Sequence, residues 1–269
     1  MPQPPLSIGW FSTGRGPGSR ALLSAAVDAI RTGYLPARLA FVFCNRERGE
    51  HEGSELFLDL VQRYGIPLVT LSSQRFRRER NARRFADVRG DFDAELLRLI
   101  GPFEPDICAL AGYMLFTAPE MSRRYPLLNL HPAPPGGPQG TWQEVTWQLI
   151  DKRAPEGGAQ VQLATEDWDR GPIVSYCTFP LTGLHFDPLW AALDSSTTAQ
   201  VRASESEDHP LFQAIRAEEV RREVPLFLAT LRRFATRALV VRDGRILDAD
   251  GHPVTPQDMT AEIEKLIHS

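Results

Sequence analysis

An amide and an imidazole lie two residues apart at the end of an apolar run, Leu127–Pro132 (LLNLHP). Alternate side chains of a strand share one face, so Asn129 and His131 are expected to point the same way. Both groups donate hydrogen bonds, the imidazole when protonated, and such donors stabilise the oxyanion of a tetrahedral intermediate at a carbonyl carbon. A lone histidine beside a strand is commonly structural, but an Asn-x-His pair at a strand end favours a functional site.

A carboxylate that could act with this pair follows in Asp167–Ile173 (DWDRGPI). Asp169 precedes Gly-Pro, and turn chemistry alone explains many aspartates in that position. Near a histidine, however, a carboxylate favours the protonated imidazole, or carries a proton through a water. Asp169 is therefore the third candidate catalytic residue.

A glycine-rich turn, Ser12–Arg20 (STGRGPGSR), follows the first apolar run and opens a helical segment. Amides at a helix N-terminus, with a guanidinium nearby, bind phosphates and carboxylates. The Gly-x-Gly-x-Gly spacing is not the Gly-x-Gly-x-x-Gly of dinucleotide-binding folds, and the second apolar run ends without the acidic residue that binds a nicotinamide ribose. The turn predicts an anion site, and a strand-to-helix turn without a ligand is the alternative.

The elements that position these groups follow from the hydrophobic pattern, in which short apolar runs alternate with helical periodicity. The pattern predicts an α/β fold with a Rossmann-like, mostly parallel sheet and helices on both faces. Such sheets bind ligands at the carboxyl ends of their strands. We predict strands at Ile8–Phe11, Leu39–Phe43, Pro67–Leu71, Ile107–Leu110 and Leu127–Leu130. We predict helices at Ser19–Thr32, Glu52–Tyr64, Phe92–Ile100, Pro119–Tyr125 and Thr141–Lys152.

Beyond Lys152 the pattern changes. We expect a pair of strands at Gly158–Leu163 and Pro172–Phe179, followed by a polar loop or disordered hinge at Asp194–His209. A helix is expected at Leu211–Arg233, and a hairpin at residues 240–251, where Asp-Gly occurs twice. We expect a catalytic domain at residues 1–183 and a C-terminal extension at 184–269.

Composition disfavours several classes of protein. The 34 acidic and 30 basic residues give a formal net charge of −4, so no global positive field holds a nucleic-acid backbone. Cys44, Cys108 and Cys177 are odd in number and widely spaced, which predicts buried free thiols rather than disulfides or a zinc site. The N-terminal residues do not have the pattern of a signal peptide, and no run of apolar residues approaches the roughly 18 that a membrane span needs. We expect a cytoplasmic protein without nucleic-acid or membrane partners.

Three motifs after the glycine-rich turn resemble those of the folate-dependent formyltransferases, among which the glycinamide ribonucleotide transformylases are most similar. The motifs are Leu110–Met114 (LAGYM), Asn129–Pro132 (NLHP) and Asp169–Val174 (DRGPIV). The resemblance extends from Ile8 to about Pro180 and implies the formyltransferase fold.

The resemblance also implies a reaction and a set of site residues. A formyl group passes from 10-formyltetrahydrofolate to a primary amine of a small, phosphorylated acceptor such as glycinamide ribonucleotide, a step of purine biosynthesis. Asn129, His131 and Asp169 are the catalytic residues, and no metal is required. The implied folate-binding residues are Tyr113, Met114, Leu115, Phe116, Thr165 and Asp167. The implied acceptor-binding residues are Gly16, Gly18, Ser19, Arg20 and, by position only, Glu219. The oligomeric state is left open, with a homodimer as one option.

The chain departs from the family at three places that bear on the acceptor. Residues 133–136 (APPG) replace the family's Ser-Leu-Leu-Pro after His-Pro. Leu115 stands where the transformylases have an arginine, and Arg20 stands where they have an asparagine. These changes bring the identity of the acceptor into question more than the reaction.

Other functions are weighed by features that they would require. A methionyl-tRNA formyltransferase needs a basic C-terminal barrel, but the residues after Leu181 are few and not basic. A formyltetrahydrofolate hydrolase needs a regulatory domain ahead of the first strand, where we expect no room for one. A nicotinamide-dependent reductase needs the missing dinucleotide fingerprint. A sugar-nucleotide N-formyltransferase and a non-catalytic folate- or nucleotide-binding protein on the same scaffold both stay open.

Overall fold

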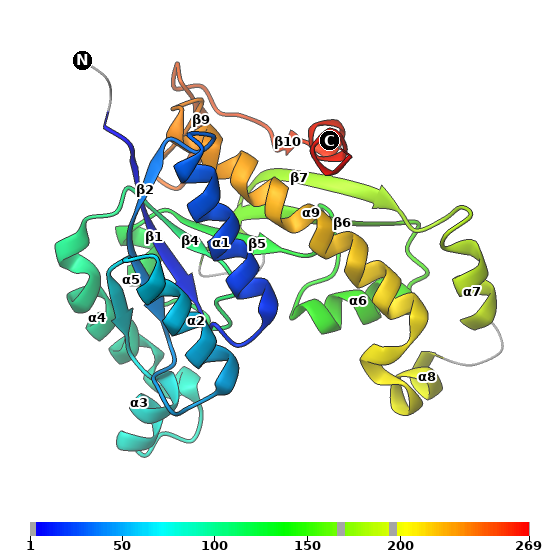
Figure 1. The fold of residues 1–269 in the computed structure, drawn as a ribbon, viewed down its shortest axis with the longest axis horizontal. Helices are drawn as coiled ribbons and strands as arrows, with labels where there is room; N and C mark the ends of the chain where they lie inside the picture. The colour runs from blue at the N-terminus through cyan, green and yellow to red at the C-terminus, as the bar shows by residue number, and fades with distance from the viewer. Residues whose placement is uncertain (1–3, 166–169, 194–197, 269) are drawn as a thin grey trace. The chain divides into compact units, whose positions relative to one another are not determined.

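The chain forms two compact units in the computed structural model, which describes residues 4–165, 170–193 and 198–268 (Figure 1). Unit 1 comprises Met1–Asn129, Gln162–Pro172 and Leu228–Val254, and unit 2 comprises Leu130–Val161, Ile173–Phe227 and Thr255–Ser269. Three elements contribute residues to both units: β5 (Leu127–His131), β6 (Glu156–Leu163) and α9 (Pro210–Ala235).

The sheet of unit 1 has the strand order β6-β5-β4-β1-β2-β3. Its other strands are β1 (Leu6–Ser12), β2 (Ala37–Cys44), β3 (Leu68–Thr70) and β4 (Ile107–Leu110). The pairs β1–β2, β2–β3, β1–β4 and β4–β5 are parallel. The chain runs outward from β1 to β3 and returns to β4 on the other side of β1. The strand order therefore reverses between β1 and β4, and this switch point is where open α/β sheets bind ligands.

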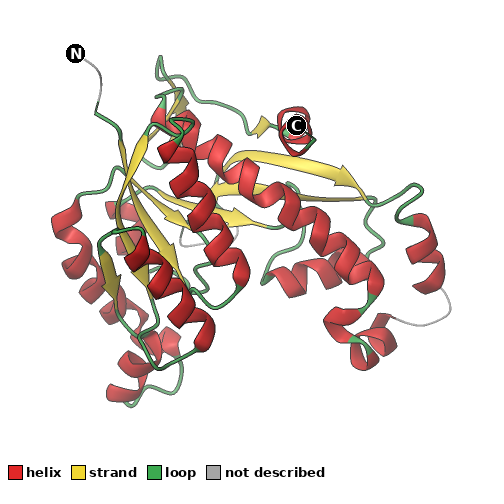
Figure 2. Ribbon diagram, in the orientation of Figure 1, coloured by secondary structure: helices red, strands yellow, loops and turns green. Residues whose placement is uncertain are grey.

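Helices connect the parallel strands of unit 1 (Figure 2). They are α1 (Pro17–Arg31), α2 (Glu52–Arg63), α3 (Ser73–Glu79), α4 (Arg89–Ile100) and α5 (Pro119–Arg124), with short 3₁₀ turns at Phe85–Val88 and Gly101–Phe103. α1 packs beside α2, and α4 beside α5. Right-handed crossovers place the first pair on one face of the sheet and the second pair on the other. Phe11, Phe43 and Phe92 are fully buried in the core that the second pair covers.

Unit 2 is built around β6, β7 (Ile173–Pro180) and β10 (Gln257–Asp258). β7 runs antiparallel to β6, since the Leu181 amide donates to the Pro155 carbonyl and, at the other end of the pair, the Leu163 amide donates to the Pro172 carbonyl, both at 2.9 Å. β10 pairs with β7 in parallel. Its helices are α6 (Trp142–Asp151), α7 (Asp187–Leu193), α8 (Thr198–Ser204), most of α9, and α10 (Thr260–Ile267), with a 3₁₀ turn at Ser206–Asp208. In its apolar core the rings of Trp147 and Phe212 lie 5.0 Å apart.

The hairpin expected at residues 240–251 is confirmed. β8 (Leu239–Arg242) pairs antiparallel with β9 (Arg245–Asp248). Asp243 and Gly244 form the two-residue turn with φ of 51° and 71°. Positive φ at both central residues is what makes Asp-Gly favourable in such a turn.

The predicted fold class is confirmed, and the predicted strands and helices are present with ends shifted by a few residues. The expected loop or disordered hinge at Asp194–His209 is wrong for its described part, which contains α8 and a 3₁₀ turn. Val201 is buried in the core of unit 2, but it is the one large apolar residue in the sequence of Thr198–Ser204, and a single such residue gives no hydrophobic periodicity. The pattern also misses four short elements: α3, α7, β10 and α10.

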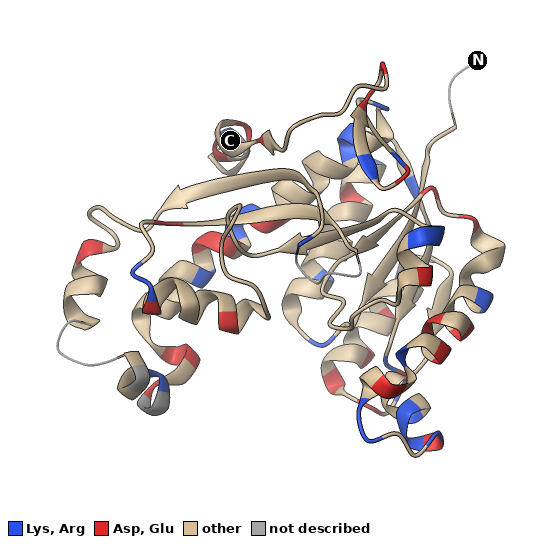
Figure 3. Ribbon diagram, turned by 180° about the vertical axis from the view of Figure 1, so that it is seen from behind, with Lys and Arg blue, Asp and Glu red and all other residues tan. Residues whose placement is uncertain are grey.

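Two predictions from composition can be compared with the structure. Cys44, Cys108 and Cys177 are buried free thiols, as expected. No helix among the described residues is long and apolar enough to cross a membrane. Charged residues of both signs are scattered along the ribbon (Figure 3). Residues 75–89 are an exception, with seven arginines and two acidic residues, so the charge is mixed globally but not along this segment.

Candidate functional site

The predicted catalytic pair lies at the carboxyl end of β5. Asn129 is half-buried, and His131 is only 3 % exposed. Asn129 pairs with Leu110, the last residue of β4, so it lies one strand away from β4 and its switch point. Because the two residues are separated by one position of a strand, their side chains share a face of β5.

A loop after β5 fixes the ring of His131. Its Nε2 lies 2.9 Å from the carbonyl oxygen of Pro138. A carbonyl can only accept, so Nε2 carries a hydrogen and donates it. A hydrogen bond from one ring nitrogen to a backbone carbonyl sets the tautomer and the orientation of a functional imidazole.

This loop, residues 132–140, is called the histidine loop, and it is held by neighbours in unit 2. Gln148 Nε2 donates to the Gln139 carbonyl at 2.9 Å, and Thr141 forms a capping box with Glu144 at the start of α6. Gly140 has a φ of 118°, and a Cβ there would come 2.5 Å from Glu144 Oε2. Glycine is therefore required where the histidine loop enters α6.

The glycine-rich turn connects β1 to α1 at the switch point. Gly16 is the N-cap of α1 and has no side chain to bond the first amides of the helix, an arrangement that admits an anion. A Cβ at Gly16 or at Gly18 would meet nothing within 4 Å, so the space beside both glycines is open. Arg20 donates to the Gly53 carbonyl at 3.2 Å, which ties the turn to the first residues of α2.

The predicted folate-binding residues 113–116 belong to the segment Gly112–Thr117, called the folate segment, which follows β4 across the switch point. Tyr113 is buried, and its ring lies 5.6 Å from that of Phe11. Leu115 packs partly buried against the same core. Met114 and Phe116 are instead 52 % and 43 % exposed. Two exposed large apolar side chains close together suit a flat apolar ligand.

A buried carboxylate holds the far end of the folate segment. Asp93 of α4 is fully buried and accepts a hydrogen bond from the amide of Ala118, at the start of α5. Burial raises the pKa of Asp93 from about 3.8 to about 6, and the hydrogen bond from Ala118 opposes this rise. Its Oδ1 has no hydrogen-bond partner among the described residues.

Glu219 lies in the interior of unit 2. It is fully buried, and its Oε2 accepts from Arg216 at 3.0 Å and from Thr146 at 3.4 Å. Burial raises the pKa of Glu219 to about 8, against the effect of Arg216. The Arg216 guanidinium stacks 4.9 Å from the ring centre of Trp142. A role for Glu219 in acceptor binding stays a prediction.

Three predicted site residues follow β6 in the sequence. Thr165 is exposed, whereas Asp167 and Asp169 lie outside the described residues. The structure thus brings the glycine-rich turn and the folate segment together at the switch point of unit 1, and it puts Asn129 and His131 on one strand. The functional roles of all these residues remain predictions.

Sequence reasoning missed the residues that hold these segments. Thr13 bonds the folate segment, and Gln148 bonds the histidine loop. Neither has a local signature, because each acts on a backbone group outside its own element. Asp93 had one available signal, since it shares the apolar face of its helix with Leu96 and Ile100.

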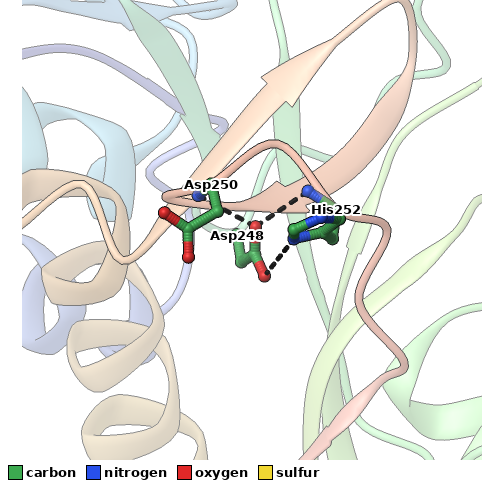
Figure 4. A group of neighbouring side chains, drawn as sticks. All are labelled: Asp248, Asp250 and His252. Atoms are coloured by element: carbon green, nitrogen blue, oxygen red, sulfur yellow. Dashed lines mark hydrogen bonds and ion pairs between the residues drawn. The ribbon is translucent and has the colours of Figure 1, made fainter.

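A separate group of metal-type ligands lies in the hairpin of unit 1. The ligand atoms of Asp248, Asp250 and His252 lie within 4.8 Å of one another, the one such group of three among the described residues (Figure 4). Asp248 Oδ1 accepts from the amides of Asp250 and His252 at 3.0 and 2.8 Å, and Oδ2 lies 3.6 Å from His252 Nδ1. These bonds explain the arrangement as a closed turn after β9.

Comparisons with known proteins point in the same direction as the motifs. A family model described as formyl transferase matches residues 16–182. The chain is 26 % identical over 196 residues to phosphoribosylglycinamide formyltransferase of Escherichia coli, covering 72 % of this chain and 81 % of that protein. It is 27 % identical over 151 residues to formyltetrahydrofolate deformylase of Bacillus subtilis, covering 54 % of this chain and 42 % of that protein. The crystal structure of glycinamide ribonucleotide transformylase 1 from Symbiobacterium toebii has a TM-score of 0.62 at 25 % identity, covering 90 % of this chain and 92 % of that one.

Proposed function

Since the chain belongs to the formyl transferase family, whose members use a formyl-folate donor, we propose that it formylates a primary amine on a small phosphorylated acceptor. The observation that carries the proposal is the Asn-x-His pair at the end of β5, inside the matched range 16–182. Glycinamide ribonucleotide is the acceptor we favour. The match covers 81 % of the Escherichia coli protein named for it, against 42 % of the deformylase.

The proposed reaction moves one formyl group and one proton. The amine nitrogen attacks the formyl carbon of 10-formyltetrahydrofolate, the carbonyl oxygen becomes an oxyanion, and the bond from that carbon to the folate N10 then breaks. Asn129 and a protonated His131 donate hydrogen bonds to the oxyanion. Asp169 favours the protonated imidazole, or passes the amine proton through a water to N10. The products are the N-formyl acceptor and tetrahydrofolate, with no metal required.

We assign the pterin of the folate to the exposed side chains of the folate segment. The support is physical, because Met114 and Phe116 are large, apolar and exposed, and a flat heterocycle needs such a surface with a few polar anchors. Tyr113 and Leu115 anchor this segment to the core. Thr165 and Asp167 are the polar contacts that the family resemblance adds.

We assign the phosphate of the acceptor to the glycine-rich turn. The open space beside Gly16 and Gly18, and an N-cap without a side chain, support an anion at the start of α1. Ser19 lies in the first turn of α1, and Arg20 adds a planar donor at its edge. A sugar nucleotide carrying an amine would satisfy the same contacts.

One other activity has a specific observation in its favour. The similarity to the Bacillus subtilis deformylase makes water a conceivable acceptor, in which case formate is released instead of an N-formyl amine. A protein that binds folate without turnover is the remaining alternative.

A thermal-shift screen tests the acceptor assignment. Phosphorylated amines, glycinamide ribonucleotide first, are added with tetrahydrofolate present, and a ligand at a hundred times its Kd should stabilise the fold by about 2.7 kcal/mol. The matched control for each amine is the corresponding phosphorylated alcohol, which should also bind but yields no N-formyl product. If no amine stabilises the protein at millimolar concentration, the acceptor assignment is wrong.

A further inference from the structure

Thr13 connects the glycine-rich turn to the folate segment across the switch point. It follows the last residue of β1 and is 2 % exposed. Its amide donates to the Gly112 carbonyl at 2.9 Å, and its Oγ1 accepts from the amide of Met114 at 3.0 Å. One residue of the turn therefore holds the first and third residues of the folate segment by two hydrogen bonds.

A second contact joins the same two segments. Gly112 has a φ of 71°, and a Cβ at this position would lie 2.7 Å from Ser19 Oγ. The hydroxyl of Ser19, in the first turn of α1, therefore packs directly against the backbone of Gly112. A movement of the start of α1 cannot leave the start of the folate segment unchanged, because close-packed groups transmit displacement.

The folate segment is also fixed at its other end. Ala118 is held by Asp93, and the ring of Tyr113 is buried among aromatic side chains. Met114 and Phe116 lie between these fixed points in the chain and are 52 % and 43 % exposed. The conformation that presents both side chains thus depends on the Thr13 contacts at one end and on Asp93 at the other.

We propose that Thr13 is a positioning residue that couples the two substrate sites, so that an anion in the glycine-rich turn tightens the binding of folate. This inference rests on the proposed function of the two segments. An anion bound by the amides at the start of α1 restricts the turn and, through Thr13 and Ser19, restricts Gly112 and Met114. Folate then binds a segment that is already ordered and loses less conformational entropy, which gives positive coupling without a change of shape. The coupling is reciprocal, so folate tightens the anion by the same factor.

Calorimetry measures this coupling with two defined probes, tetrahydrofolate and inorganic phosphate. The Kd of tetrahydrofolate is determined with and without saturating phosphate for the wild-type protein, for Thr13→Val and for Thr13→Ser. Valine keeps the shape of threonine but removes Oγ1, whereas serine keeps the hydroxyl. We expect phosphate to tighten tetrahydrofolate at least about fivefold in the wild type and in Thr13→Ser, and less than about twofold in Thr13→Val.

Amide hydrogen exchange in the protein without ligands provides a second readout. The Met114 amide should exchange faster in Thr13→Val, by roughly tenfold for the loss of one hydrogen bond, and at the wild-type rate in Thr13→Ser. This result depends on the Thr13 contact alone, not on the activity. An unchanged exchange rate in Thr13→Val would overturn the proposed path of the coupling.

The binding results separate the coupling from the function. Wild-type protein that binds both probes independently keeps the proposed function and overturns the coupling. Equal coupling in the wild type and in Thr13→Val overturns the role of Thr13. Wild-type protein that binds neither probe overturns the proposed function and the coupling with it.

Discussion

The folate segment and the histidine loop follow neighbouring strands, but they are held in different ways. The folate segment is bonded to Thr13, 101 positions before Met114, and its far end to Asp93 on another helix. The histidine loop is bonded to His131 and Gln148, seven and nine positions from their partners. The folate segment is therefore held by residues that are distant in the sequence, whereas the histidine loop is held by residues that are close to it in the sequence. We therefore expect substitutions around the folate segment to change ligand binding, and those around the histidine loop to change turnover.

The largest expected effect is on turnover, from the residues that the mechanism assigns to the oxyanion and the proton. His131→Ala, Asn129→Ala and Asp169→Ala should each lower kcat at least about a hundredfold, because a lost oxyanion donor costs about 3–4 kcal/mol of barrier and Asp169 supports the donor His131. The melting temperature should change little in Asn129→Ala and Asp169→Ala, whereas His131→Ala also loses a buried ring and its hydrogen bond to Pro138. His252→Ala removes an exposed histidine of the hairpin and is the matched control, with normal kcat. Near-normal turnover in His131→Ala, with every candidate amine, would disprove the mechanism.

The next largest expected effect is on the pH dependence of stability, and it comes from Asp93, the buried carboxylate at the end of the folate segment. Its pKa is raised by burial from about 3.8 to about 6, so its neutral form is favoured in the folded state. The stability that this gives is fully present below pH 4 and is lost as the pH rises through 6, by up to about 3 kcal/mol at 1.36 kcal/mol per unit. Asp93→Asn cannot ionise and should remove this loss.

Thermal unfolding between pH 4 and pH 7.5 checks the prediction for Asp93. The stability of Asp93→Asn relative to the wild type should rise with pH over this range. Asp91→Asn, at an exposed position of the same helix, should leave the pH dependence unchanged. A parallel pH dependence in the wild type and in Asp93→Asn would show that the Asp93 carboxylate is not the source.

A smaller effect distinguishes the glycine-rich turn from the folate segment. Arg20→Ala should raise the KM for the acceptor by the equivalent of about 1.5–3 kcal/mol, as expected for the loss of one charged hydrogen bond to a phosphate. The Kd of tetrahydrofolate, measured without acceptor, should stay unchanged. Arg63→Ala, at an exposed position of α2, is the control. Equal damage to folate binding, or no effect on any acceptor, would remove the assignment of the phosphate to this turn.

The smallest effect concerns the histidine loop and compares two of its glycines. Gly140→Ala places a side chain at a φ of 118° and against Glu144, whereas Gly136→Ala meets nothing within 4 Å at a φ of 73°. We expect Gly140→Ala to destabilise the fold by about 1–3 kcal/mol and to lower kcat, because the loop that orients His131 is disturbed. Gly136→Ala should cost about 1 kcal/mol and leave kcat near normal. Equal kcat values for the two variants would mean that the loop does not position the imidazole.

The groups that could be predicted from the sequence are those with a local signature. Strands buried on both faces give continuous apolar runs, and Asp-Gly favours a hairpin turn, so the sheet and the pair β8–β9 can be predicted from the sequence. The pairing of Asn129 with His131 can also be predicted, because strand periodicity alone puts their side chains on one face.

What could not be predicted depends on contacts between distant segments. The hydrogen bond from Met114 to Thr13 exists only once β1 and β4 are neighbours, and nothing near Thr13 in the sequence marks it. Glu219 could be named by position, but its burial beside Arg216 follows from the packing of α9 in unit 2. Short amphipathic elements such as α8 carry too few apolar residues for a periodic signal.

Product stoichiometry shows whether the protein transfers a formyl group to an amine. Wild-type protein is mixed with 10-formyltetrahydrofolate and glycinamide ribonucleotide, the release of tetrahydrofolate is followed by absorbance, and the N-formyl product and formate are quantified. Formyl transfer to the amine should give one N-formyl product for each tetrahydrofolate, no formate, and no release of tetrahydrofolate without an amine. Formate in place of the N-formyl product, at a rate that does not depend on the amine, would disprove formyl transfer to an amine. So would the absence of tetrahydrofolate release with every phosphorylated amine.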